Sequence, residues 1–337
     1  MQEQVNILAI ETSCDETAAA VVQNGREVLA EQLYSQADIH REYGGVVPEI
    51  ASRSHVEKLP HIVPAAIDGA GGKEQIDAVA VTYGPGLVGA LLTGVSYAKA
   101  LAYAWGKPLV PVNHIAGHIC ANYISHKELK PPFICLVISG GHTQIVKTLD
   151  YTSYETLGQT RDDAAGEAID KVARVLGLPY PGGPNLQQLA LAGDSARYEM
   201  PRVFKGESHL DFSFSGLKTA VINMLHRMDQ AGEAYKKEDV AASFLKAVAD
   251  TLANNTFEAA RRQGMDVLAV AGGVSANTQV RQAFEARAAK EGIKLYFPEM
   301  KYCTDNAAMI ASAGYYAYMD GRRGDMTLNA KPVLELL

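Results

Sequence analysis

Val5-Asn6-Ile7-Leu8-Ala9-Ile10-Glu11-Thr12-Ser13-Cys14-Asp15-Glu16-Thr17-Ala18-Ala19-Ala20-Val21-Val22 is the stretch that decides the expected fold. It contains two apolar runs, residues 5–10 and 18–22, and the polar residues 11–17 separate them. A short apolar run that ends at polar residues is typical of a buried strand. The stretch therefore predicts a β-hairpin near the start of the chain.

A second stretch repeats this arrangement. Phe133–Ile138 is apolar, Ser139–Thr143 is a polar and glycine-rich turn, and Gln144–Val146 continues after it. Two similar hairpins in one chain predict two related halves, which begin near residues 5 and 133.

The rest of the chain alternates between strand and helix patterns, which predicts an α/β protein with mixed sheets. At 337 residues the chain exceeds the usual size of a single core, so two lobes are expected. Residues 150–237, rich in glycine, proline and charge, are expected to form an insertion of loops and short helices. Further strands are predicted at 76–82, 109–112, 267–271 and 295–298, and helices at 86–105, 239–262, 278–290 and 304–319.

The composition is that of an ordinary globular protein, with 47% hydrophobic and 20% charged residues. The net charge of −7 excludes a basic field over the whole surface, so nucleic-acid binding would need a local patch or a partner. No apolar run reaches about 18 residues, so no membrane span is expected. The four cysteines form no Cys-x-x-Cys pair, which favours a reduced, cytoplasmic setting.

Two glycine turns follow predicted strands. Ser139-Gly140-Gly141 follows the strand of the second hairpin, and Gly272-Gly273 lies between a strand and a helix. Glycine allows a ligand to approach the backbone, and N–H groups at a helix N-terminus attract anions. Two such turns favour a nucleotide in a cleft between the lobes, and the alternative is tight turns that need positive φ.

A further acidic stretch, Asp162–Lys171, is expected to be helical, with Glu167 and Asp170 on one face. These carboxylates could hold ribose hydroxyls or a cation, and the alternative is solvated helix charge. Pro181-Gly182-Gly183-Pro184 then forms a rigid turn that could press the backbone against a sugar or base.

His114 and His118 are four residues apart, so on a helix both imidazoles can reach one cation. Asp305 is the best candidate for a third ligand, and this donor set suits iron(II) or zinc. Two alternatives stay open: an incidental histidine pair, and a helix cap formed by Thr304 or Asp305. A metallopeptidase would need glutamate where Ile115 stands, so that activity is excluded.

Taken together, these motifs resemble the TsaD family of tRNA threonylcarbamoyltransferases, formerly described as glycoprotein endopeptidases. The resemblance covers nearly the whole chain, and its motifs occur in the family's order. The matching stretches are Ile10–Thr17, Gly44–Glu49 with Ala51–Arg53, Gly84–Gly89, His114–His118, Val137–Gln144, Asp162–Lys171, Asp211–Thr219, Gly272–Asn277 and Cys303–Asn306.

The resemblance implies a duplicated, actin-like (ASKHA, ribonuclease H-like) two-lobe fold with mixed sheets and a central cleft. Residues 1–113 and 306–337 would form the N-terminal lobe. Residues 114–305 would form the C-terminal lobe, with the insertion at about 150–237.

The resemblance also implies a site. One divalent metal per subunit, Fe²⁺ rather than Zn²⁺ by preference, would bind His114, His118 and Asp305. ATP, ADP or threonylcarbamoyl-adenylate would bind in the cleft. The contacts to this substrate would be Val137, Ile138, Ser139, Gly140, Gly141, Asp170, Gly183 and Asn277.

The chain departs from its wider family at two positions. Archaeal and eukaryotic relatives carry a tyrosine, an extra metal contact, at the position of Val137. Some bacterial relatives carry an acidic residue at the position of Gln187, so a ligand role for Gln187 is left open. No catalytic acid or base is identified.

The implied reaction transfers the threonylcarbamoyl group to N6 of the adenosine 3′ of the anticodon, in tRNAs that read codons beginning with A, and releases AMP. The implied partners are an actin-like paralogue (TsaB), a small ATPase (TsaE) and a separate synthase of the adenylate. The alternatives are an actin-like phosphotransferase or kinase and a non-catalytic, ATP-regulated scaffold. A kinase would have no use for the histidine pair, and loss of transfer on mutation of His114 would exclude both alternatives.

Overall fold

The computed structural model describes residues 4–201 and 209–336, which form two compact units. Unit 1 comprises residues up to 132, 148–155 and from 298 onwards, and unit 2 comprises 133–147 and 156–297. Residues 114–132 and 298–305, expected in the C-terminal lobe, therefore lie in unit 1. The physical reason is that α4 (His114–Ser125) packs against α10 (Ala307–Met319).

Unit 1 contains a mixed five-stranded sheet in the order β3-β2-β1-β4-β5. The β1–β2 hairpin predicted from residues 5–22 is confirmed, with Ala9 opposite Ala20. β3 also pairs antiparallel with β2, whereas β4 and β5 extend the sheet in parallel from β1. The strands are β1 (Asn6–Glu11), β2 (Glu16–Gln23), β3 (Glu27–Ser35), β4 (Ala78–Gly84) and β5 (Leu109–Asn113).

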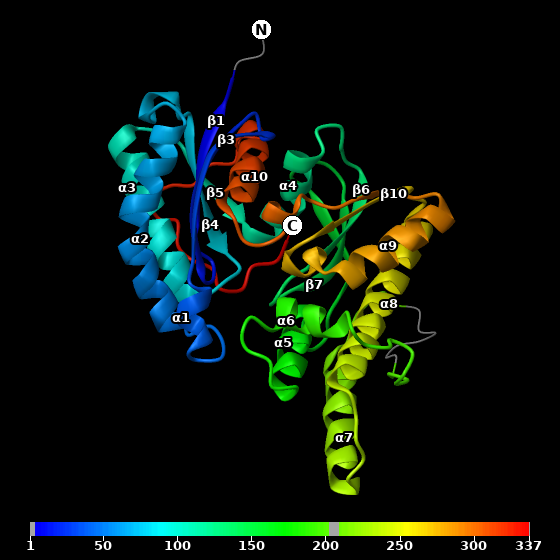
Figure 1. Cartoon of the computed structure of the whole chain (residues 1–337). Coiled ribbons are helices and arrows are strands. Elements are labelled where there is room, and N and C mark those ends of the chain that lie inside the picture. The colour runs from blue at the N-terminus through cyan, green and yellow to red at the C-terminus, as the bar shows by residue number, and fades with distance from the viewer. Residues whose placement is uncertain (1–3, 202–208, 337) are drawn as a thin grey trace. The chain divides into compact units, whose positions relative to one another are not determined.

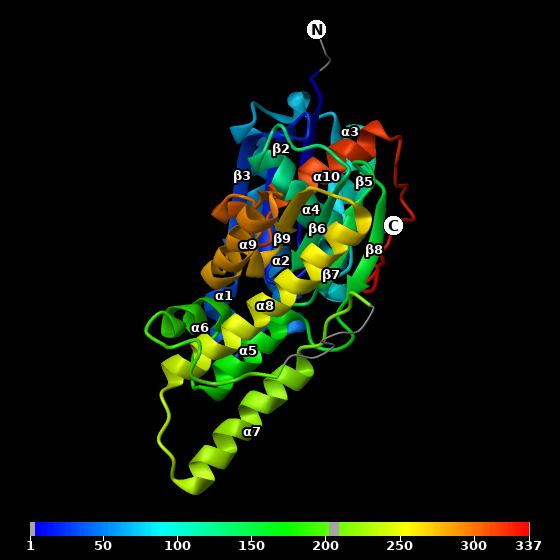
Figure 2. The same cartoon turned by 90° about the vertical axis from the view of Figure 1, so that its right-hand side faces the viewer.

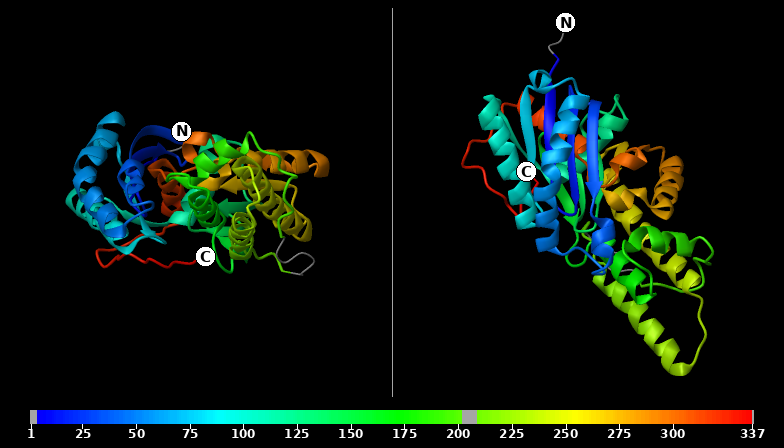
Figure 3. Two further views of the ribbon diagram at one scale, coloured as in Figure 1. Left: turned by 60° about the horizontal axis from the view of Figure 1, so that its bottom comes forward. Right: turned by 60° about the vertical axis from the view of Figure 1, so that its left-hand side comes forward.

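Helices cover both faces of this sheet (Figures 1 and 3). Successive side chains of a strand point to opposite faces. Leu8 and Ile10 of β1 therefore pack with α2 (Pro48–Gly69) and α3 (Val88–Trp105), while α10 packs on the other face. A short helix, α1 (Ala37–Arg41), precedes α2.

Unit 2 repeats the topology of unit 1. The order of its strands, read as β8-β7-β6-β9-β10, matches β3-β2-β1-β4-β5 position by position. β6–β9 and β9–β10 are parallel, as are the corresponding β1–β4 and β4–β5. The duplication predicted from the two hairpins is thus confirmed. The strands are β6 (Phe133–Ile138), β7 (Thr143–Thr148), β8 (Tyr154–Gln159), β9 (Val267–Ala271) and β10 (Lys294–Tyr296).

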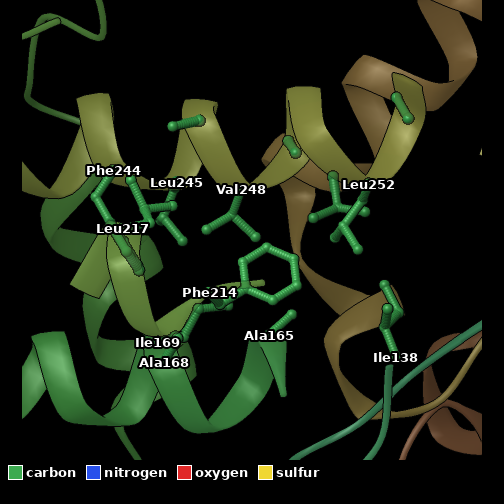
Figure 4. Close-up of a cluster of buried hydrophobic side chains, with 14 of the residues drawn as sticks. Ile138, Ala165, Ala168, Ile169, Phe214, Leu217, Phe244, Leu245, Val248 and Leu252 are labelled. Carbon is green, nitrogen blue, oxygen red and sulfur yellow. The ribbon is translucent and has the colours of Figure 1, made fainter. Parts of the chain in front are cut away.

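The expected insertion contributes to the core of unit 2. Figure 4 shows Phe214 between Ala165 of α5 and Val248 of α8, and all three side chains are fully buried. The long α8 crosses the strands of this sheet (Figure 2). The helices are α5 (Ala165–Val175), α6 (Gly182–Ala190), α7 (Ser215–Ala231), α8 (Lys237–Gln263) and α9 (Thr278–Glu291), and three 3₁₀ turns span Lys73–Gln75, Gly273–Ala276 and Met300–Tyr302.

Within residues 4–201 and 209–336, no helix combines the length and the apolarity needed to cross a membrane.

Candidate functional site

The two histidines lie in the first turns of α4, in unit 1. The side chain of Asn113 caps this helix by accepting a hydrogen bond from Ile115 N at 2.8 Å. The helix therefore begins at His114, and His118 follows one turn later on the same face. Their ring centroids are 4.6 Å apart in an edge-to-face arrangement.

Asp305 immediately precedes the cap of α10. Asn306 is that cap, because its side chain accepts a hydrogen bond from Met309 N at 2.8 Å. Neither Thr304 nor Asp305 is the cap, and α10 begins at Ala307, later than the sequence predicted. The carboxylate of Asp305 is directed to the histidines, with Oδ1 at 3.2 Å from His118 Nε2 and 3.5 Å from His114 Nε2.

These three side chains fit a metal ion. One donor atom from each lies within 4.8 Å of the others. His118 is fully buried, and within the described residues neither of its ring nitrogens has a partner with hydrogen-bond geometry. Buried polar atoms without partners are rare and costly. Two imidazole nitrogens and one carboxylate oxygen suit zinc or iron(II) and leave coordination positions open.

Charge is balanced locally at the triad. Burial opposes protonation of His114, but the carboxylates of Asp305 and Glu11 raise its pKa well above the usual value. Burial lowers the pKa of His118. Burial also works against ionisation of Asp305, yet the two histidines hold the pKa of that carboxyl well below its usual range. The carboxylate of Asp305 and the two imidazoles thus shift one another's pKa values.

Glu11 and Ser13 also contact His114, and the sequence did not single them out. Glu11 Oε2 lies 3.3 Å from His114 Nδ1, and Ser13 Oγ lies 3.1 Å from the same nitrogen. Glu11 lies 103 residues before His114, and no spacing rule connects them. The signals in the sequence were that both residues belong to the polar turn of the first hairpin and to the stretch Ile10–Thr17 that matched the family.

Two further segments hold this polar turn in place, and one of them is the stretch Gly84–Gly89 that matched the family. His55 of α2 contacts the carbonyl oxygen of Cys14 through Nε2 at 2.9 Å, and its Nδ1 lies 2.8 Å from Thr17 Oγ1. Leu87 N donates to Ser13 O at 2.8 Å, and a Cβ on Gly86 would lie only 2.6 Å from that oxygen. The glycine at position 86 thus allows the close approach that fixes Ser13.

The expected nucleotide contacts all lie in unit 2, where several surround the end of β6. Gly140 and Gly141 are exposed, neither has positive φ, and a Cβ on either would meet no heavy atom within 4 Å. The turn therefore does not require glycine at these two places. Gly272 differs, because its φ is +89° and a Cβ there would lie 2.4 Å from Ile138 O.

Parallel pairing brings these turns to one edge of the sheet. Val137 of β6 pairs with Ala271 of β9, so Ser139 and Gly272 follow the ends of neighbouring strands. Ligands of α/β proteins commonly bind at such carboxyl ends. Val137 and Ile138 are fully buried, so only their backbone could contact a ligand.

Three helices begin near this edge. A Cβ on Gly166 of α5 would lie 2.5 Å from Ser139 O, which shows how closely α5 approaches the turn. Asp170 Oδ1 accepts a hydrogen bond from Gly183 N of α6 at 3.1 Å. Asn277 caps α9, and Gln187 of α6 accepts a hydrogen bond from Thr278 N at 2.8 Å. Gln187 thus joins α6 to α9.

The other acidic residues of the 162–171 stretch have structural partners. The carboxylate of Asp162 accepts hydrogen bonds from the backbone N–H groups of Phe214 and Ser215, where α7 begins. Asp163 pairs with Lys218 of α7, and Glu167 pairs with Lys171. These contacts join the stretches at 162–171 and 211–219, and only Asp170 is directed to the start of α6.

Comparisons with solved structures define the fold class of the chain. The HypF structure from T. kodakarensis has a TM-score of 0.67 at 15% identity, over 97% of this chain and 50% of HypF. Component A of the Acidaminococcus fermentans (R)-2-hydroxyglutaryl-CoA dehydratase has a TM-score of 0.54 at 15% identity, over 94% and 98% of the two chains. The chain has the duplicated, actin-like fold that the family resemblance implied.

Sequence comparisons then identify the family. The TsaD family model, tRNA N6-adenosine threonylcarbamoyltransferase, matches residues 27–312. A relative of that name from Clostridium botulinum strain 657 is 54% identical over all 337 residues and 99% of its own length. Another from Clostridium perfringens strain SM101 is 55% identical over 98% of both chains. The chain belongs to the TsaD family of tRNA N6-adenosine threonylcarbamoyltransferases.

Proposed function

We propose that this chain transfers a threonylcarbamoyl group from threonylcarbamoyl-adenylate to N6 of the adenosine 3′ of the anticodon, in tRNAs that read codons beginning with A. Membership of the TsaD family supports the transfer to a tRNA adenosine. The observation that carries the site is the His114–His118–Asp305 triad. Within the described residues, neither buried ring nitrogen of His118 has a partner with hydrogen-bond geometry.

One divalent metal would be held by the Nε2 atoms of His114 and His118 and by Oδ1 of Asp305. Both Fe²⁺ and Zn²⁺ accept imidazole and carboxylate ligands. Fe²⁺ is the preferred ion because the family resemblance implies it, and Zn²⁺ is the alternative. When bound, such an ion supplies Lewis-acid polarisation of a carbonyl group. The metal dependence of the enzyme is part of this proposal.

Unit 2 would hold the adenylate. The amides of Gly140 and Gly141 are the best phosphate donors of the β6–β7 turn, because Ser139 N already donates to His142 O at 2.8 Å. The N-terminus of α9, which Asn277 caps, adds partial positive charge. The carboxylate of Asp170, next to Gly183, suits ribose hydroxyls.

The transfer forms one bond and breaks one. The N6 amine attacks the carbamoyl carbonyl carbon, the bond from that carbon to the phosphate oxygen breaks, and AMP leaves. The amine is a weak nucleophile, but the mixed anhydride is activated, so positioning and charge stabilisation can supply the acceleration. The proton released from N6 is not assigned to a residue of this chain.

We also propose protein partners, because a net charge of −7 favours help in docking a polyanionic tRNA. An actin-like TsaB paralogue and a small TsaE-type ATPase would assist, and a separate synthase would supply the adenylate. The four cysteines are free, which agrees with a cytoplasmic setting.

The test is reconstitution with these partners, threonylcarbamoyl-adenylate and the tRNA. His114→Ala and Asp305→Ala should lose at least about 100-fold in modified adenosine, since positioning and electrostatic effects of this size are common in catalysis. His61→Ala, on an exposed position of α2, is the matched control and should retain full transfer. Metal analysis after anaerobic purification should find one ion per wild-type chain and none in the two site variants.

Full transfer by both His114→Ala and Asp305→Ala would refute the metal-centred mechanism.

A further inference from the structure

Glu11 is an acidic residue whose side chain is buried in unit 1. It ends β1 and is fully buried, and the one ion pair that the described residues give it is with His114. Burial of a carboxylate costs several kcal/mol unless charge and hydrogen bonds compensate it. The contact with His114 is therefore one of the interactions that compensate the burial of Glu11.

The two nitrogens of the His114 ring face two different carboxylates. Nδ1 lies 3.3 Å from Glu11 Oε2, and Nε2 lies 3.5 Å from Asp305 Oδ1. A neutral imidazole carries its hydrogen on one nitrogen and a lone pair on the other. If the hydrogen is on Nδ1 and is donated to Glu11, the lone pair is on Nε2. This nitrogen faces Asp305, so the lone pair is available to a metal ion held between them.

The carboxylate itself is held by two further donors. Ser13 N donates to Oε1, and the hydroxyl of Thr82 on β4 donates to Oε2. Both oxygens of Glu11 thus accept hydrogen bonds. A glutamine amide could not accept at both positions, because one of its two terminal atoms is a donor.

We propose that Glu11 is a positioning residue that accepts the Nδ1–H of His114 and thereby makes Nε2 the metal donor. This inference rests on the proposed metal site. Carboxylates that hold the second nitrogen of a metal-binding histidine occur widely, and their loss commonly weakens metal binding 10- to 100-fold.

The first test compares variants with the wild-type protein in two measurements. One is the affinity for Zn²⁺, measured by competition with a chelator, and the other is the absorption spectrum of the Co²⁺-loaded protein. Glu11→Gln should bind Zn²⁺ about 10- to 100-fold more weakly and change the Co²⁺ spectrum. Asp77→Asn is the matched control, because Asp77 accepts a hydrogen bond from Asn6 N at the opposite end of β1. The control should keep wild-type affinity and spectrum.

Ser13→Ala tests the rival acceptor of the Nδ1 hydrogen. If Ser13→Ala lost the affinity and Glu11→Gln kept it, Ser13 would be the positioning residue and the proposal would be overturned. Wild-type affinity and an unchanged Co²⁺ spectrum in Glu11→Gln would also overturn it.

A second test reads the position of the hydrogen in the wild-type protein itself. Long-range ¹H–¹⁵N correlation spectra of the Zn²⁺-loaded wild-type protein report which ring nitrogen of each histidine carries hydrogen. The signals of His114 are assigned as those that are missing from the spectrum of His114→Gln. Hydrogen on Nδ1 supports the proposal, and hydrogen on Nε2 refutes it. If wild type and His114→Ala bind Zn²⁺ equally, the metal site of the proposed function fails instead, so the two failures are distinguishable.

Discussion

Alanine should have opposite effects at Gly140 and Gly272, although both glycines belong to turns at one edge of the unit 2 sheet. At Gly140 the backbone lies outside the left-handed region, and a Cβ would meet no heavy atom within 4 Å. At Gly272 φ is +89° with ψ 164°, and a Cβ would lie 2.4 Å from Ile138 O. The structure shows no need for glycine at position 140. At position 272 glycine is needed both for the positive φ and for the close approach to Ile138 O.

The magnitudes follow from this difference. A residue other than glycine in the backbone conformation of Gly272 costs about 1–3 kcal/mol. Relief of the overlap with Ile138 O adds about 1–3 kcal/mol, as in overpacked cores. Gly272→Ala should therefore lower the free energy of unfolding by about 2–6 kcal/mol. Gly140→Ala should leave it unchanged or raise it by up to about 1 kcal/mol, because alanine restricts the unfolded chain.

Binding should depend on Gly140 even though stability does not. If its amide cradles the phosphate, a methyl group there hinders the approach of the ligand, and we expect at least about a tenfold loss of ADP affinity, or about 1.4 kcal/mol. Urea unfolding gives the stability of each variant, and isothermal titration with ADP gives the affinity. Gly141→Ala, in the same open turn, should behave as Gly140→Ala does, and His61→Ala on α2 should keep wild-type stability and affinity.

A stable Gly140→Ala protein that binds ADP with wild-type affinity would refute a role of the Gly140 amide in phosphate binding. In that case the open space at the β6–β7 turn would be unrelated to a ligand. A Gly272→Ala protein with unchanged stability would separately refute the steric account of that turn.

Three further changes test the structural contacts. Asn306→Ala should lower the free energy of unfolding by about 1 kcal/mol in urea titrations, because α10 loses its cap. Gln187→Leu should cost about 1 kcal/mol by the same measurement, because Thr278 N loses its acceptor. Burial opposes ionisation of Asp163, but Lys218 and Lys171 lower its pKa, so its contribution to stability is present above its unfolded pKa of about 3.9 and is lost as pH falls. Asp163→Asn should therefore be less stable than wild type at pH 7, and the difference should shrink toward pH 3 in unfolding curves measured across that range.

Two of these changes have a neighbouring control. Thr304→Ala should leave stability unchanged, since Asn306 provides the cap. Gln188→Leu changes the residue next to Gln187 and should cost less than Gln187→Leu. A stability difference for Asp163→Asn that stays constant from pH 7 to pH 3 would contradict the ion-pair account.

The sequence predicted the repeated part of the fold well, because buried strands leave a local signal. The apolar runs at residues 5–10 and 133–138 could be recognised as strands without knowledge of the strands that they pair with. β3 was missed because most of its side chains are partly or largely exposed and do not alternate clearly. The 150–237 stretch was expected to be loops and short helices, but Phe212 and Phe214 in it are fully buried.

The triad was predicted from spacing and resemblance, whereas its surroundings were not. A pair four residues apart on a helix is a local pattern, and His114 with His118 is one. The contact of Glu11 with His114 depends on how β1 and α4 pack, and the bond from Thr278 to Gln187 depends on how α6 meets α9. Such contacts are set by tertiary structure, so residue patterns along the chain do not reveal them.

The duplicated topology has a consequence for how the two halves diverged. The turn between β1 and β2 and the turn between β6 and β7 occupy the same place in the repeat. In the first half this turn carries Asp15 and begins next to Glu11, so it presents negative charge. In the second half it contains Ser139, Gly140, Gly141 and His142, and no carboxylate. The same place in the repeat thus carries acidic side chains in one half and none in the other.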